Sequence, residues 1–260
     1  METRKFIYFA SDFHLGAGTI ADSLYRERKI VRWLDEVVKP NAAALFLLGD
    51  VFECWFEYKK VVPKGFTRLL GKLAELVDAG IPITMFTGNH DLWMFGYLEE
   101  EIGVSLHKSV VMKEWNNKKF LLGHGDGLGP GDYGYKRMKK VFTHPLAQWA
   151  YSRLHPNTGL SIAQNLSSLS RKHNMEPSHF MGFEKEWLVL YCEEKLKREY
   201  IDYFIFGHRH LPINLLLSNK KSRYINLGDW MKHFSYAYWD GTALQYHFFE
   251  NTNGVVYENK

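Results

Sequence analysis

Five short motifs rich in aspartate and histidine recur along the chain, and each offers side chains that can bind a metal ion. The motifs are Asp12-Phe13-His14, Gly49-Asp50-Val51-Phe52-Glu53, Gly88-Asn89-His90-Asp91, Gly123-His124-Gly125-Asp126 and Gly207-His208-Arg209-His210. They supply carboxylate, amide and imidazole groups but no thiolate. This donor set suits manganese, iron(II), zinc or cobalt and does not suit calcium. The motifs therefore predict metal-dependent chemistry.

The number of candidate ligands exceeds what one ion can use. The seven candidates are Asp12, His14, Asp50, Asn89, His124, His208 and His210. Two divalent ions that share one carboxylate would use them all, and Asp50 is the natural bridge. Two ions about 3.5–4 Å apart lower the pKa of a shared water and stabilise in-line attack on phosphorus. The pattern predicts a dinuclear centre for phosphoester hydrolysis that needs no protein nucleophile.

Each motif follows a run of apolar residues that is typical of a buried strand. The runs are Lys5–Ala10, Ala44–Leu48, Ile83–Thr87, Phe120–Leu122 and Tyr203–Phe206. Helical apolar spacing lies between the first three runs, over Arg26–Val38 and Phe66–Ala79. This alternation predicts a layered α/β core, in which polar side chains gather beyond the carboxyl ends of the strands.

Residues 127–180 break this pattern, and we expect them to form a helical insertion or lid within a single domain spanning residues 1–260. Helical stretches are expected around Tyr135–Leu154 and Leu160–His173, with Pro156 and Gly159 between them. Glu184–Tyr200 has the pattern of a further helix. Short strands should complete the chain, and Asn116-Asn117 predicts a tight hairpin turn before Phe120–Leu122.

Composition narrows the class of protein. The chain has 260 residues, of which 46% are apolar and 24% charged, as in globular domains. Two cysteines, Cys54 and Cys192, exclude a disulfide scaffold and fit a reducing compartment. No apolar run reaches the roughly 18 residues of a membrane span, and no signal peptide is expected. A net charge of +4 permits an anionic ligand or lipid surface, and no nucleic-acid partner is expected.

The ordered motifs resemble those of the calcineurin-like metallophosphoesterases over nearly the whole chain. The resemblance implies two packed mixed sheets flanked by helices. It implies a first metal site of Asp12, His14, Asp50 and His210, and a second of Asp50, Asn89, His124 and His208. It also implies that His90 donates a proton or hydrogen bond to the leaving oxygen and that Asp91 orients it. Glu53 either orients the histidine-rich shell or is solvated.

The motifs that begin at Ser11, Gly49, His124 and Gly207, together with the insertion after His124, also look like those of the UDP-2,3-diacylglucosamine hydrolases of lipid A synthesis. That resemblance implies substrate contacts from Asn89, His90, Asp132, Ser170, Asn174 and His208. It implies manganese as the metal and attack of water on the UDP α-phosphorus. The products would be UMP and 2,3-diacylglucosamine 1-phosphate.

Two positions depart from that narrower family. The best-known members carry arginine where this chain has His90, and a lysine where it has Pro177. Phosphate contacts could come instead from Lys136, Arg137 or Arg171. Two alternatives therefore stay open: a phosphodiesterase or phosphatase for another nucleotide or phosphodiester, and a non-catalytic binding scaffold. The scaffold ranks last because every expected ligand position is filled.

The first helical stretch of the insertion interleaves basic residues with apolar ones. Such a helix can lie on an anionic lipid surface or cap a cleft for acyl chains. The plainer interpretation is a lid whose apolar face packs on the core. Beside a phosphoesterase site, we expect an acylated UDP-glucosamine substrate and a cytoplasmic protein at the surface of the inner membrane. No protein partner is predicted.

Overall fold

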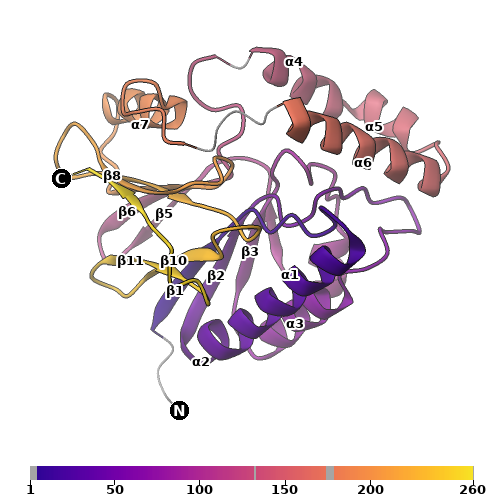
Figure 1. Cartoon of the computed structure of the whole chain (residues 1–260), viewed down its shortest axis with the longest axis horizontal. Helices are drawn as coiled ribbons and strands as arrows, with labels where there is room; N and C mark the ends of the chain where they lie inside the picture. The colour runs from indigo at the N-terminus through magenta and orange to yellow at the C-terminus, as the bar shows by residue number, and fades with distance from the viewer. Residues whose placement is uncertain (1–4, 132, 174–178, 260) are drawn as a thin grey trace.

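The computed structural model describes residues 5–131, 133–173 and 179–259, with the backbone alone for residues 168–173. Two mixed β-sheets pack face to face in this part of the chain, and helices cover their outer faces (Figure 1). This is the α/β sandwich predicted from the alternation of strands and helices.

The first sheet contains the strands that lead to three of the motifs. Its order is β11 (Leu244–Phe248), β10 (Ser235–Trp239), β1 (Phe6–Ala10), β2 (Ala42–Leu48), β3 (Ile83–Phe86) and β4 (Ser105–His107). Strands β1 to β4 run parallel to one another, and β10 is antiparallel to both of its neighbours. The carboxyl ends of β1, β2 and β3 therefore lie at one edge of the sheet. The short strand β4 was not predicted.

The second sheet contains the strands that lead to the other two motifs. Its order is β12 (Tyr257–Glu258), β8 (Pro212–Leu216), β9 (Arg223–Leu227), β7 (Tyr203–Phe206), β6 (Lys118–Leu122) and β5 (Val111–Trp115). Strands β6, β7 and β9 are parallel. The predicted hairpin joins β5 to β6, where Asn116 and Asn117 have φ of 51° and 60°. Two successive left-handed residues are the signature of a type I′ turn.

Three apolar clusters hold the layers together. One lies between the two sheets and includes Phe9, Phe46 and Phe120. A second packs the outer face of the first sheet against α1 (Ile20–Trp33) and α3 (Thr67–Asp78), and the third packs the other sheet against α7 (Trp187–Leu196). Both sheets are thus covered on both faces, which is why their parallel strands are continuously apolar.

Helices α1 and α3 depend on each other at their ends. Thr19 and Asp22 form a capping box at the start of α1. Helix α3 begins after Phe66, which offers no side-chain cap, but buried Glu27 of α1 accepts hydrogen bonds from the backbone N–H groups of Arg68 and Leu69 at 2.9 and 3.1 Å. A carboxylate from one helix thereby satisfies the first turn of the other.

The first predicted helix differs in its bounds. We predicted a helix over residues 26–38, but α1 starts at Ile20, and a π-helical turn, η1 (Leu34–Val38), and a short α2 (Lys39–Asn41) continue it. The helix starts earlier because Thr19 caps it, and the spacing of apolar residues gives no information about a polar cap. A second π-helical turn, η2 (Leu98–Ile102), precedes β4.

The insertion consists of α4 (Tyr133–Phe142), α5 (Pro145–Tyr151) and α6 (Pro156–His173), which stand together at the upper right of Figure 1. The stretch predicted as one helix is divided before Pro145, since proline disfavours a helical residue ahead of it. Gly159 lies inside α6 and does not separate helices. A Cβ atom there would collide with the Tyr58 hydroxyl, so glycine permits α6 to pack closely on the core.

Candidate metal centre

The five motifs meet where the two sheets adjoin. Asp12 follows β1, Asp50 follows β2 and Asn89 follows β3, whereas His124 and His208 follow β6 and β7 in the other sheet. Because these strands are parallel within each sheet, their carboxyl ends lie side by side. The topology thus brings together residues that are almost two hundred positions apart.

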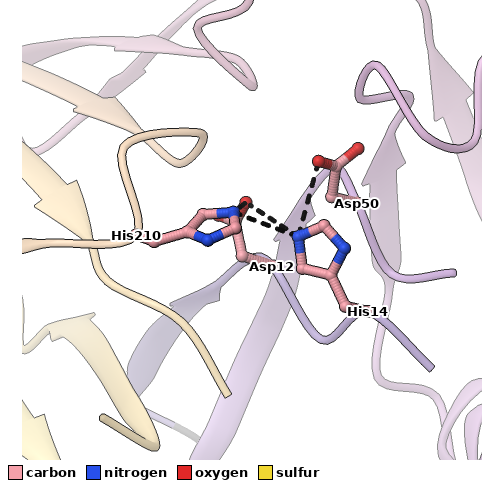
Figure 2. A group of neighbouring side chains, drawn as sticks. All are labelled: Asp12, His14, Asp50 and His210. Atoms are coloured by element: carbon pink, nitrogen blue, oxygen red, sulfur yellow. Dashed lines mark hydrogen bonds and ion pairs between the residues drawn. The ribbon is translucent and has the colours of Figure 1, made fainter. Parts of the chain in front are cut away.

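Asp12 and His14 from the loop after β1, Asp50 from the loop after β2 and His210 from the loop after β7 point toward one another (Figure 2). The Nε2 atom of His14 lies 3.1 Å from Nε2 of His210, 3.7 Å from Asp12 Oδ1 and 3.6 Å from Asp50 Oδ2. His210 Nε2 is 3.1 Å from Asp12 Oδ1. Asp12, His14 and Asp50 are buried.

The remaining candidates adjoin this group through Asp50. His124 Nε2 lies 3.3 Å from Asp50 Oδ2 and 3.2 Å from Asn89 Oδ1. The rings of His124 and His208 are edge to face, with centroids 5.1 Å apart. The structure therefore brings all seven predicted ligands into one cluster and places Asp50 between its two halves.

The backbone at these positions is held in an unusual conformation. Asp12, His14, Asp50, His208 and His210 all have positive φ, between 45° and 70°. Such values are uncommon outside glycine and gather at functional sites, where surrounding structure enforces them.

Buried side chains and small residues enforce these turns. The Arg26 guanidinium donates to the backbone carbonyls of His14 and Ala17 at 2.7 and 2.8 Å, which fixes the loop after β1. Gly88 and Gly207 permit close approach, because a Cβ atom at either position would overlap the carboxylate of Asp50 or Asp12, respectively.

Hydrogen bonds from outside the cluster orient two of its imidazoles. His14 Nδ1 lies 3.0 Å from Glu53 Oε2, and His124 Nδ1 lies 2.8 Å from the Leu48 carbonyl oxygen. Both rings consequently turn Nε2 toward the carboxylates. Metal-binding histidines commonly have such a partner on the far nitrogen. Glu53 is therefore buried and orienting, not solvated.

Within the cluster, burial and the attraction between carboxylates and imidazoles shift the pKa values in opposite directions. Burial alone would lower the pKa of His14, but hydrogen bonds with Asp12 and Glu53 raise it to about 10. Burial would also lower the pKa of His124, but the negative charge of Asp50 outweighs it and that pKa rises to about 10. Burial would raise the pKa of Asp50, yet the facing histidines hold it well below its usual range. The buried carboxylates of Asp12 and Asp50, surrounded by imidazoles, fit divalent cations. Bound cations would replace the protonated imidazoles in stabilising the carboxylate charges.

His208 differs from the other histidines of the cluster. Burial and the neighbouring His124 lower its pKa to about 4. Its imidazole is thus neutral at pH 7, the form that binds a metal. Its backbone N–H donates to Asp12 Oδ2 at 3.0 Å and fixes the loop after β7 against the loop after β1.

His90 lies beside the cluster, and its ring centroid is 4.9 Å from that of His14. Its Nδ1 atom is 2.9 Å from the Ser167 hydroxyl oxygen and 3.3 Å from the Glu53 carbonyl oxygen. Burial lowers the pKa of His90. Ser167 also donates to the Glu53 carboxylate. One hydroxyl from α6 therefore links the insertion to two residues at the metal cluster.

The prediction that Asp91 orients the His90 ring is wrong. Asp91 is buried, and its carboxylate accepts from the backbone N–H groups of Val51 and Phe52 at 2.8 and 3.2 Å and of Gly88 at 2.7 Å. It therefore ties the loop after β2 to the loop after β3. Adjacent residues in a tight turn point in different directions, which explains why proximity in sequence misled the prediction.

Sequence reasoning missed Ser167. It lies one helical turn before Ser170, the serine that was predicted to meet substrate. Helical spacing was the only sequence signal for it, because i and i+3 share a helix face. Ser170 lies in α6 within the part described by its backbone alone, and the predicted contacts Asp132 and Asn174 lie outside the described residues.

Asp126 anchors the first helix of the insertion. Its carboxylate accepts from the Tyr135 hydroxyl and, at 2.5 Å, from Lys139 Nζ. On the other side of the insertion, Trp93 packs on Phe142 and Tyr151, with ring centroids 5.6 and 4.8 Å apart. The insertion is thus fixed to the core on both sides of the metal cluster.

The family model for calcineurin-like phosphoesterases matches residues 7–212. The chain belongs to the calcineurin-like phosphoesterase family. The match confirms the predicted membership, and with the hydrolases named below it confirms the predicted class of metal-dependent phosphoesterase.

Curated relatives agree with this assignment. A Porphyromonas gingivalis protein named UDP-2,3-diacylglucosamine hydrolase is 39% identical over 254 residues, covering 93% of this chain and 96% of that protein. A protein of the same name from Shewanella sp. strain W3-18-1 is 30% identical and covers 85% and 88%. The solved structure of Yfce, a phosphoesterase from E. coli, aligns with a TM-score of 0.47 at 14% identity, covering 94% and 93%.

Proposed function

We propose that this phosphoesterase hydrolyses the pyrophosphate of UDP-2,3-diacylglucosamine to UMP and 2,3-diacylglucosamine 1-phosphate. The buried Asp/His cluster supports phosphoester chemistry, and one observation carries the choice of substrate. That observation is the 39% identity, over nearly the full length of both chains, to a protein named for this hydrolysis.

Two divalent ions, for which manganese is our proposal, would occupy the cluster. Asp12, His14, Asp50 and His210 would hold the first ion, and Asp50, Asn89, His124 and His208 the second. The distances around Asp50 support its role as the shared ligand, since His14 and His124 approach the same Oδ2 atom at 3.6 and 3.3 Å. Bound ions would supply Lewis acidity at phosphorus and a more acidic water.

The residues around the cluster would position substrate and move protons. His90 is partly buried beside the ligands, with 11% of its side chain exposed, and would donate to the oxygen that leaves phosphorus. Ser167 and the Glu53 carbonyl oxygen, both near Nδ1, would leave Nε2 free for this task. Asn89 and His208 would also meet the diphosphate. Asp132, Ser170 and Asn174 remain proposed substrate contacts from sequence.

The insertion would bind the acylated part of the substrate at a membrane surface. Apolar side chains are exposed along its three helices and the turn between α5 and α6, and these are Met138, Val141, Leu146, Trp149, Leu154, Ile162 and Leu166. Basic residues lie between them, so the surface combines apolar area with positive charge, as interfacial helices do. No described helix is both long and apolar enough to cross a bilayer. The proposed location is therefore the cytoplasmic surface of the inner membrane.

The test is release of UMP from UDP-2,3-diacylglucosamine by the purified protein, with manganese and after chelation. We expect manganese-dependent release that His90→Ala reduces strongly while leaving the bound metal in place. A protein that leaves this substrate intact but cleaves a generic aryl phosphodiester would retain the metal centre and refute the lipid substrate. A protein that binds two ions but cleaves neither would favour the scaffold.

A further inference from the structure

A cavity of about 570 Å³ lies next to the metal cluster, on the side of His124. Its walls come from the end of β3, the loop after β4, the loop after β6 and the inner face of α4. His124 forms part of the wall, so the cavity borders the proposed second metal site. Its volume falls within the range of small-molecule sites, roughly 300–1,000 Å³.

Positive charge dominates the described lining of this cavity. Five basic side chains, Lys108, Lys136, Arg137, Lys139 and Lys140, accompany one acidic side chain, Asp126. Lys139 is paired with Asp126 at 2.5 Å, and Lys136 donates to the Gly129 carbonyl oxygen at 2.6 Å.

The other three bases leave the charge uncompensated. Lys108, Arg137 and Lys140 have no ion-pair partner among the residues that the structure describes, and all three are exposed. Like charges gathered around one cavity repel each other unless an anion binds between them. The cavity is therefore built for an anionic ligand.

The rest of the lining indicates more than a bare anion. The hydroxyl groups of Thr87 and Ser109 and the ring of Tyr133, which is 71% exposed, complete the wall. Hydroxyl groups can hydrogen-bond a sugar or base, and an exposed aromatic ring can stack on a base. These features suit a nucleotide better than an inorganic ion.

The two sides of the metal cluster differ in character. On the side of His90, the insertion packs aromatic side chains against the core through Trp93, Phe142 and Tyr151. On the side of His124, the cavity wall carries basic side chains among apolar ones such as Val110 and Leu128. A substrate with an acylated sugar on one side of a diphosphate and a nucleoside on the other matches this difference.

We infer that the cavity binds the nucleoside monophosphate half of the substrate, with Lys108, Arg137 and Lys140 neutralising its phosphate. The inference rests on the proposed function, because it takes the substrate to be a UDP-linked lipid. It assigns binding residues that lie outside the metal cluster. It also implies that UMP, once formed, binds there as a product inhibitor.

The experiment is a calorimetric titration of the manganese-loaded protein with UMP, in wild type, Lys108→Ala and Lys140→Ala. Lys64→Ala, at an exposed lysine away from the cavity lining, is the matched control. Loss of a hydrogen bond to a charged group should weaken UMP binding about tenfold in each cavity variant and leave the control unchanged. Higher salt should reduce the difference. The metal contribution is common to all four proteins, so the differences isolate the cavity.

Three results would overturn the inference. UMP could bind equally to wild type and the cavity variants, inorganic phosphate could bind wild type as tightly as UMP, or the variants could weaken binding of 2,3-diacylglucosamine 1-phosphate in place of UMP. Hydrolysis of UDP-2,3-diacylglucosamine is measured separately. If wild type releases no UMP from that lipid, the proposed function fails, whereas the titration still decides whether the cavity takes a nucleotide.

Discussion

Replacing Ser167 with alanine tests whether the insertion positions His90, the residue proposed to act on the leaving group. The Ser167 hydroxyl donates to the Glu53 carboxylate and lies 2.9 Å from His90 Nδ1. Because the hydroxyl proton points to Glu53, its oxygen accepts from Nδ1–H of His90. With Nδ1–H engaged in this way, His90 can donate from Nε2 only as the imidazolium, whose positive charge the nearby Glu53 carboxylate stabilises.

The magnitude follows from the hydrogen bond that the substitution removes. A hydrogen bond to a charged group contributes about 1.5–3 kcal/mol. Each 1.36 kcal/mol corresponds to a tenfold change in rate. If His90 depends on this contact in the transition state, Ser167→Ala should lower kcat by about 10- to 100-fold. KM should change little, because the contact is made inside the protein.

The assay is UMP release at saturating substrate across a pH series. Ser167→Thr keeps a hydroxyl and should restore most of kcat, and the alkaline limb of the pH profile, where the proton donor is lost, should move in Ser167→Ala alone. Ser161→Ala is the control, since among the described residues its hydroxyl bonds only to the Asn157 carbonyl oxygen of the same helix, at 2.8 Å. An unchanged kcat in Ser167→Ala, or an equal loss in Ser161→Ala, would refute the positioning role.

Three further predictions concern the metal cluster. Asp50→Asn should remove the shared charge and reduce bound manganese below two ions per chain, which elemental analysis measures; two retained ions would exclude Asp50 as the bridge. In the metal-free protein His14 and His124 have a pKa of about 10, so they are protonated at pH 7 and must lose protons to bind metal. Manganese affinity should therefore rise from pH 6 to pH 8, and calorimetry in buffers of different ionisation enthalpy should show proton release; no release would contradict the assigned protonation. Gly207→Ala should lower stability by about 1–3 kcal/mol, because the new Cβ overlaps the Asp12 carboxylate. Thermal unfolding measures this loss, and a wild-type Tm would contradict the overlap.

The fold and the ligand cluster were largely predictable because both leave local signals. A buried parallel strand is a continuous apolar run, and the polar residue just after it must lie at the carboxyl end. Asp12, Asp50 and His124 each satisfy this pattern, and the structure places them together. Asn116 and Asn117 likewise predicted the hairpin turn, since few residues tolerate positive φ.

Sequence reasoning could not foresee the contacts that a partner from a distant segment makes. The start of α3 depends on Glu27, which lies more than forty positions earlier in the chain. Asp91 stabilises two loops through backbone amides, so its contacts depend on how those loops pack. Neither the contacts of Glu27 nor those of Asp91 can be predicted from the secondary-structure propensity of the local sequence.

The sequence by itself determined which chemistry this protein can perform, because residue type and position after a strand are local properties. It supplied the seven proposed ligands, the sandwich and the place of the helical insertion. Only the tertiary structure decided what surrounds them. Ser167 reaches Glu53 across 114 positions and His90 across 77, and the basic cavity joins α4 to loops of both sheets. Such contacts arise when separately formed layers pack, and packing depends on the whole chain at once.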